Sequence, residues 1–346
     1  PMKKSYLISL IMLCAFSSCH NQDWEFPDFG TRSVYFSYQY PVRTITLGED
    51  NEVDNALDNA HKCKIMATTG GGYSNNNNIV IGIEVDNTLC GNDFRFKGTT
   101  DPIVPMPSEY YTLADNKIVI PNGQITGGVE VHFTDAFFAD KQALKNTYVI
   151  PLRMTDVQNA DTILQGKPLA SNPKMLLASD WDILPKNYIL YCVKYINPWH
   201  AVYLRRGKDV ITGKAGHESL TREIVRHNQY VEKDEVCDLV TRSINEVELS
   251  LMAKDESGND IPYIVVLQFD ENGDCVVKDD SDDYTISGTG KYVKDGDKKS
   301  WGNEDCNVIY LDYEVDMPSM KYHTKDTLVV RNRGVVKEEF TPELIP

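Results

Sequence analysis

Apolar and polar residues alternate one by one in many short runs of this chain, and this period of two limits the folds that it can adopt. In residues 33–42, Val34 and Phe36 alternate with smaller or polar residues, and residues 78–87 repeat the pattern. Such alternation is typical of β-strands with one buried and one solvated face. Further runs, separated by Gly, Pro and Asn, lie at 117–121, 127–133 and 147–154. Only residues 135–145 have the pattern of a short helix, so the chain is predicted to be all-β.

The first half of the chain is predicted to be an antiparallel β-sandwich of the Ig-like type over residues 31–155. Its strand-like runs follow one another without the helices that would cover a parallel sheet. Within it, the Gly- and Asn-rich segment 67–78 lacks the Gly-Lys-Ser/Thr ending of a phosphate-binding loop. We expect that segment to be a flexible hairpin connection.

The second half has a different organisation. Three prolines and mixed polarity at 165–187 predict a connector over residues 156–198. From Trp199, roughly eight or nine strand-like runs follow with short turns, one of them the hairpin turn at 270–273. A meander of this kind can close into a barrel, which removes exposed sheet edges. Residues 199–346 are therefore predicted to form an antiparallel β-barrel.

The beginning of the chain has the layout of an export signal. Two lysines, an apolar segment at 6–16 and two serines precede Cys19, which predicts a signal peptide over residues 1–18. The apolar segment is shorter than the ~20 residues of a spanning helix. Residues 16–19 resemble a bacterial lipobox, whose cysteine receives lipid; the alternative is an ordinary signal peptide with an incidental cysteine. A lipidated Cys19 would anchor the chain to a membrane through a tether at 19–30.

Acidic residues directly follow the predicted lipidation site. Asp23 and Glu25 resemble the acidic tag with which Bacteroidota send lipoproteins to the cell surface. The predicted location is therefore the outer membrane, with the protein anchored by lipid and facing the cell surface.

Charge and cysteine content limit the classes of partner. The formal net charge is −16, and it becomes −18 when the signal peptide and its two lysines are removed, so nucleic acid is not expected as a partner. The six cysteines after the lipobox permit disulfides, for example Cys63–Cys90 and Cys275–Cys306, or buried free thiols. Their spacing predicts no zinc site, and no metal or cofactor is expected.

Several segments resemble surface lipoproteins of polysaccharide-utilisation loci. The segment 107–133 and residues 146–154 are similar to the N-terminal β-sandwich known as domain of unknown function 1735, and segments such as 199–207 and 308–315 are similar to its lipocalin-like C-terminal companion. The resemblance implies a two-domain surface lipoprotein that binds oligosaccharide or polysaccharide beside an outer-membrane transporter and its lid lipoprotein. Some relatives are described as adhesion proteins, so cell adhesion or a structural role is the alternative.

Aromatic residues in polar loops are the candidates for glycan binding, because flat rings stack on the apolar faces of sugars. Trp301 lies in a loop with almost no apolar neighbours, and Tyr292 and Tyr284 could extend its surface. The alternative for Trp301 is that its ring packs on the end of the barrel.

Hydrolysis is the less favoured activity. Asp312 and Glu314 would lie on one strand face about 6.6 Å apart, a spacing compatible with an inverting pair of carboxylates. The same pattern is typical of the solvated side of a strand. No nucleophile motif occurs, so the chain is predicted not to be an enzyme.

Overall fold

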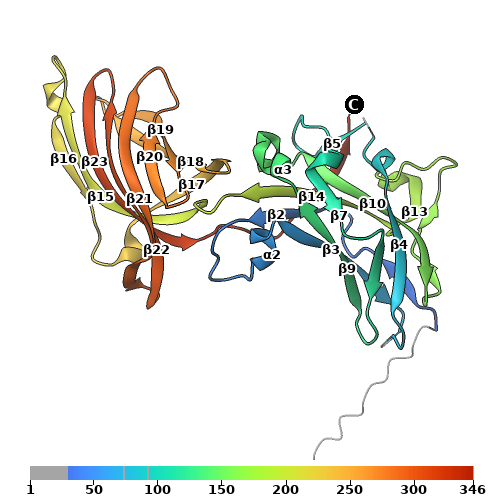
Figure 1. Ribbon diagram of the computed structural model, residues 1–346. Coiled ribbons are helices and arrows are strands. Elements are labelled where there is room, and N and C mark those ends of the chain that lie inside the picture. Colours follow the sequence, from blue (N-terminus) through green and yellow to red (C-terminus); the bar gives the residue numbers. More distant parts are fainter. Residues whose placement is uncertain (1–29, 73–74, 92, 346) are drawn as a thin grey trace, which may run out of the picture.

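The computed structural model describes residues 30–72, 75–91 and 93–345. Two β-rich bodies are joined by a narrow waist, and the C-terminal end returns to the N-terminal body (Figure 1). The predicted signal at 1–18, the predicted lipidation site Cys19 and most of the tether lie outside the described residues. Within the described part of the chain, no helix is long and apolar enough to cross a membrane.

The N-terminal domain consists of two main sheets that share one core. The first sheet has five strands, in the order β11 (Thr162–Ile163), β1 (Ser33–Tyr35), β3 (Lys62–Gly70), β9 (Thr126–Phe133) and β7 (Tyr111–Leu113). The second has seven strands: β24 (Glu338–Glu339), β2 (Pro41–Thr46), β14 (Tyr188–Ile196), β10 (Tyr148–Gln158), β4 (Ile79–Val85) and β8 (Lys117–Ile120) in order, with β6 (Val104–Pro105) beside β10. Two small sheets pair β12 (Lys167–Pro168) with β13 (Trp181–Ile183) and β5 (Phe94–Phe96) with β25 (Pro342–Leu344). Most neighbours are antiparallel, but β2 with β14, β1 with β11 and β6 with β10 are parallel.

The alternating sequence pattern produces the core of this domain. β9 and β8 bury every second residue, as in Ile118 and Ile120. Each isoleucine that is fully buried stabilises the fold by roughly 1.5–3 kcal/mol. β14 departs from the pattern because one of its faces packs in this core and the other in a second cluster that includes Phe94 and Phe340. A strand covered on both faces has an almost continuous apolar sequence.

Two local predictions have different outcomes. The short helix is confirmed as α3 (Asp135–Ala139), with Phe137 and Phe138 buried and a 3₁₀ turn at Lys141–Leu144 after it. The segment 67–78 is not a hairpin connection: its first residues continue β3, and the chain then crosses to β4 in the other sheet. Composition marks a turn, but it does not specify which strands the turn joins.

The segment 156–198, predicted as a connector, supplies β14 to the middle of the seven-stranded sheet. Residues 338–344, which fall in the predicted barrel segment, pair with β2 and β5 of the N-terminal domain. The chain therefore crosses the waist twice, once after Ile196 and once after Asn332. Strand partners so distant in sequence cannot be identified from local composition.

The predicted antiparallel barrel is confirmed in the C-terminal domain. Its nine strands are β15 (Ala201–Gly213), β16 (Arg222–Arg226), β17 (Glu235–Ser243), β18 (Glu246–Lys254), β19 (Asp260–Phe269), β20 (Asp274–Lys278), β21 (Thr285–Trp301), β22 (Glu304–Asp316) and β23 (Met320–Asn332). Pairing of β15 with β23 closes eight of them into a barrel, and β16 extends the wall as a hairpin with β15.

Side chains fill the inside of the barrel. Besides apolar residues, it contains a buried charged network centred on Asp326, which is 3% exposed. Its carboxylate accepts hydrogen bonds from Arg205 Nε at 2.9 Å, Arg226 Nη2 at 2.7 Å and the Tyr313 hydroxyl at 3.1 Å. Arg226 also pairs with Asp209. These charges can be buried because each has partners of opposite sign.

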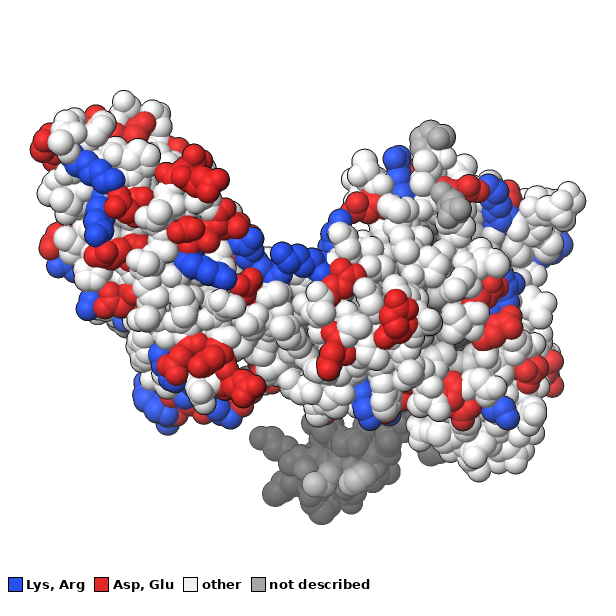
Figure 2. All heavy atoms as spheres, turned by 45° about the horizontal axis from the view of Figure 1, so that its top comes forward, with Lys and Arg blue, Asp and Glu red and all other residues white. Residues whose placement is uncertain are grey.

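The surface charge is not evenly distributed, despite the net charge of −16. Figure 2 shows two lobes separated by a notch, with acidic groups on both lobes and several basic groups at the waist.

Candidate functional site at the junction of the domains

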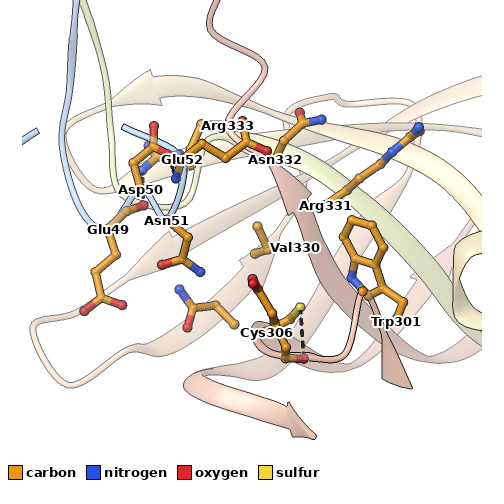
Figure 3. Close-up of a pocket in the computed structure, with 13 residues that line it drawn as sticks. Glu49, Asp50, Asn51, Glu52, Trp301, Cys306, Val330, Arg331, Asn332 and Arg333 are labelled. Carbon is orange, nitrogen blue, oxygen red and sulfur yellow. Dashed lines mark hydrogen bonds between the residues drawn. The ribbon is translucent and has the colours of Figure 1, made fainter. Parts of the chain in front are cut away.

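A pocket of 290 Å³ lies where the two domains meet (Figure 3). Three segments line it: the loop after β2, the β21–β22 hairpin and the end of β23. The lining residues are Glu49, Asp50, Asn51, Glu52, Trp301, Gly302, Glu304, Cys306, Asn307, Val330, Arg331, Asn332 and Arg333. The acidic loop lies on one side of the pocket, and Trp301 with Arg331 lies on the other.

Trp301 combines the two roles considered for it. Its half-buried ring packs against an apolar cluster on the outside of the barrel that includes Val308 and Val329, and it also lines the pocket. The indole N–H is buried, and the Cys306 thiol is its neighbour. The ring is thus held by the barrel while it remains available at the junction.

Arg333 fixes the two sides of the pocket relative to one another. Its guanidinium is buried and donates hydrogen bonds of 2.8–2.9 Å to four backbone carbonyls, those of Leu47, Glu49, Asn197 and His200. Two of these carbonyls belong to the loop after β2, and two belong to the crossing between the domains. Burial lowers the pKa of Arg333. The guanidinium therefore joins the N-terminal loop to the last strand of the barrel.

The acidic loop at 48–55 has a defined shape of its own, which we attribute to two hydrogen bonds and to the close approach of Gly48 to Pro198. The side-chain amide of Asn55 donates to the Gly48 carbonyl at 2.7 Å, and the Asp50 carboxylate accepts from the Glu52 backbone N–H at 2.9 Å. Gly48 has φ of +85°, and a Cβ there would lie 2.6 Å from Cβ of Pro198. A side chain at this position would collide with the crossing between the domains.

An ion pair across the junction adds to this support. The Lys294 ammonium of β21 contacts the Glu49 carboxylate of the acidic loop. Both side chains line a second, more open recess beside the pocket. Contacts from both domains thus hold the loop in place before any ligand arrives, which lowers the entropy that a ligand must overcome.

The other two predicted aromatic residues do not line the pocket. Tyr292 packs beneath it with the residues of the barrel interior and interacts with Asn307, a lining residue. Burial, together with the nearby charge of Glu49, raises the pKa of Tyr292 to about 12. The Tyr284 hydroxyl accepts a hydrogen bond from the Ile264 backbone N–H at 2.8 Å, which places it in the wall of the barrel.

The remaining candidates lie outside the pocket. Asp312 and Glu314 lie on the outer wall of the barrel, where they pair with Lys325 and Lys321 at 3.0 and 2.8 Å. This is the solvated strand face that was the alternative to a catalytic pair. Of the described residues, no group of three or more His, Cys, Asp or Glu side chains is arranged to hold a metal ion. The six described cysteines are free.

Sequence reasoning did not identify the acidic loop or Arg333. A signal for the loop was present, because residues 49–55 concentrate carboxylates and amides directly after a strand. No local signal marked Arg333, since its partners are up to 286 positions away. Chemically, the assembled pocket offers an aromatic ring, carboxylate and amide acceptors and a guanidinium, a combination that suits a polar ligand with an apolar face.

The fold and this pocket define a class of two-domain, all-β proteins in which a sandwich and a barrel share one junction. Residues 198–334 match a family described as domain of unknown function 5627, and residues 29–161 match a second family described only as an N-terminal domain. A solved structure of a Bacteroides ovatus protein of unknown function is 51% identical, with a TM-score of 0.86; the match covers 91% of this chain and 99% of that one. The chain belongs to the same family as that protein.

Two further Bacteroides ovatus structures have lower similarity, each at 10% identity. One is a multidomain protein that includes domain of unknown function 1735, with a TM-score of 0.39 and coverage of 88% of this chain and 96% of that one. The other is provisionally described as carbohydrate-binding, with a TM-score of 0.27 and coverage of 90% and 98%. Neither score is high enough to argue a shared overall fold. A comparison with curated proteins gives no match.

Proposed function

We propose that this protein is a glycan-binding lipoprotein of the cell surface, and that its binding site is the pocket at the domain junction. In this proposal it captures oligosaccharide and passes it to an outer-membrane transporter without breaking bonds. The single observation that supports the site is Trp301, a half-buried indole on the wall of a cavity that is otherwise rich in carboxylates and amides. Sugars require this combination, since one side of the ring is apolar and its edge carries hydroxyl groups.

The size of the cavity supports capture of a short segment of glycan. Its volume of about 290 Å³ is just below the roughly 300–1,000 Å³ typical of ligand pockets. The neighbouring recesses on the same loop give the rest of a chain space to continue over the surface.

The proposed location rests on the sequence. The lipobox-like segment 16–19 and the acidic residues after it support lipid anchoring and surface exposure. Mass spectrometry of protein isolated from its own cells should find an acylated Cys19 as the first residue. An unmodified N-terminus would contradict the anchor, and a Cys19→Ala variant in the soluble fraction would support it.

The glycan experiment uses the mature, lipid-free protein on a glycan array, followed by calorimetric titration of the ligands found. Trp301→Ala should weaken binding by about tenfold, as expected when an aromatic stacking contact is lost. Tyr310→Ala is the matched control, because Tyr310 is 43% exposed on the outer wall of the barrel and does not line the pocket. Equal affinities of wild type and Trp301→Ala would exclude the junction as the site.

One observation favours the adhesion alternative. Three strongly exposed apolar residues lie in or directly beside the paired strands β12 and β13, namely Leu169, Ile183 and Leu184, at 68%, 61% and 56% exposure. An apolar projection of this kind can take part in a contact with another protein. The adhesion role is correct if no glycan binds and if cells that carry the Leu169→Ser variant attach less well to a surface than cells that carry the wild type.

An enzyme would behave differently in the same titration. It would release reducing ends from a bound glycan over time, and Asp312→Asn or Glu314→Gln would abolish that release. We expect no release.

A further inference from the structure

The charges around the junction pocket are unequal. Four carboxylates line it, from Glu49, Asp50, Glu52 and Glu304, and there are only two guanidiniums, Arg331 and Arg333. Arg333 donates to four backbone carbonyls and has little left for a ligand. Among the described lining residues, the exposed Arg331 is thus the cation that a ligand can reach.

The acidic character continues beyond the pocket. A recess of 260 Å³ next to it shares Asp50, Glu52 and Arg333 and adds Asp54. Its other charged residues, Arg43 and Asp58, are occupied by an ion pair with each other. A glycan that enters from either side therefore meets a surface with more negative than positive charge.

Charge of this sign decides which sugars the pocket can hold. The hydroxyl groups of an uncharged sugar can donate to the carboxylates, and hydrogen bonds to an ionised acceptor are stronger than neutral ones. A uronic acid or a sulfated sugar would place its own negative charge among these carboxylates, where like charges repel. Glu49 is already paired with Lys294, and Arg331 alone cannot compensate for the three other carboxylates, those of Asp50, Glu52 and Glu304.

We propose that the junction pocket binds uncharged glycans and discriminates against uronic-acid and sulfated ones. This inference rests on the proposed function. It specifies the class of glycan. It also identifies Glu52 and Glu304 as the residues responsible for the discrimination. Both line the pocket, both are exposed, and neither has an ion-pair partner among the described residues.

The test compares matched ligands. Soluble β-glucan, galactomannan and arabinogalactan are titrated into the lipid-free protein, and so are the same polysaccharides after oxidation of their primary hydroxyls to carboxylates. For a polysaccharide that binds, the oxidised form should bind about tenfold more weakly or worse at about 20 mM salt. The difference should shrink at about 300 mM salt, because salt screens charges.

A double variant, Glu52→Gln with Glu304→Gln, should reduce this discrimination, whereas Asp312→Asn on the outer wall of the barrel should leave it unchanged. Oxidised glycans that bind as tightly as the uncharged forms, or more tightly, would overturn the inference and leave the proposed function intact. Absence of binding to any glycan, charged or uncharged, would overturn both.

Discussion

Replacement of Arg333 by methionine tests whether one buried guanidinium couples the two domains. Methionine keeps an unbranched apolar side chain like the aliphatic part of arginine, but it has neither hydrogen-bond donors nor charge. In Arg333→Met, four carbonyls, those of Leu47, Glu49, Asn197 and His200, would lose their donors at 2.8–2.9 Å. The arginine itself is 7% exposed, so water does not readily replace it.

The expected loss of stability in Arg333→Met follows from these four hydrogen bonds. Hydrogen bonds to charged groups contribute about 1.5–3 kcal/mol each to stability. The variant also no longer buries a charge that has no paired carboxylate. Because burial of an ion costs several kcal/mol, this offsets part of the loss of hydrogen bonds. We expect a net loss of about 3 kcal/mol in the free energy of unfolding. For domains of this size that loss lowers Tm by about 6–12 °C.

Urea and thermal unfolding followed by near-UV circular dichroism measure this loss, and glycan titration measures its effect on the pocket. Arg331→Met is the matched control, since Arg331 is a neighbouring exposed arginine and its removal should change stability by less than about 0.5 kcal/mol. If Arg333→Met unfolds within about 0.5 kcal/mol of the wild type, the reasoning is refuted and the domains are held together by other contacts.

Three further predictions concern stability. Burial lowers the pKa of His200 to about 4 from 6.5, and its Nδ1 accepts a hydrogen bond from the Thr241 N–H at 3.0 Å. The unfolded chain therefore binds a proton at a higher pH than the folded protein, so up to about 3 kcal/mol of stability present above pH 6.5 is lost as the pH falls toward 4. In His200→Asn, the urea midpoint should depend less on pH. An unchanged dependence would contradict the attribution of this loss to His200. Asp326→Asn leaves the buried guanidinium of Arg205 and the half-buried one of Arg226 without full compensation, so unfolding in guanidinium chloride should show a loss of stability of about 3–5 kcal/mol. An unchanged stability would mean that the network contributes nothing. Gly127→Ala would place a Cβ in β9 only 2.0 Å from the Val119 carbonyl oxygen of β8. The variant should lose about 1–3 kcal/mol of stability, which a lower Tm would show. An unchanged Tm would show that β8 and β9 can move apart without cost.

Much of the fold was predictable because it depends on local pattern. Alternation of apolar and polar residues identified the strands of both domains, and turn chemistry identified the hairpin at 270–273. The helical pattern around Phe137 and Phe138 was also correctly recognised. These features depend on residues that are neighbours in the sequence, where the period of the side chains reports directly on which face is buried.

The candidate site was predictable only in part. Trp301 was identified because an aromatic residue among polar neighbours needs a partner from elsewhere, and the structure supplies the acidic loop at 48–55. Tyr292 and Tyr284 satisfied the same criterion but pack within the barrel. Polar neighbours in sequence do not indicate whether a side chain in a barrel strand points inward.

By itself, the sequence determined that this chain is all-β and that its strands group into a sandwich and a barrel. The tertiary structure alone decided that residues 338–344 return to the first body, that Arg333 joins the two, and that Trp301 faces the carboxylates near residue 50. The reason is physical. Strand periodicity acts between adjacent residues, whereas the junction is built from hydrogen bonds between residues up to 286 positions apart. Such pairings exist only once both domains have folded.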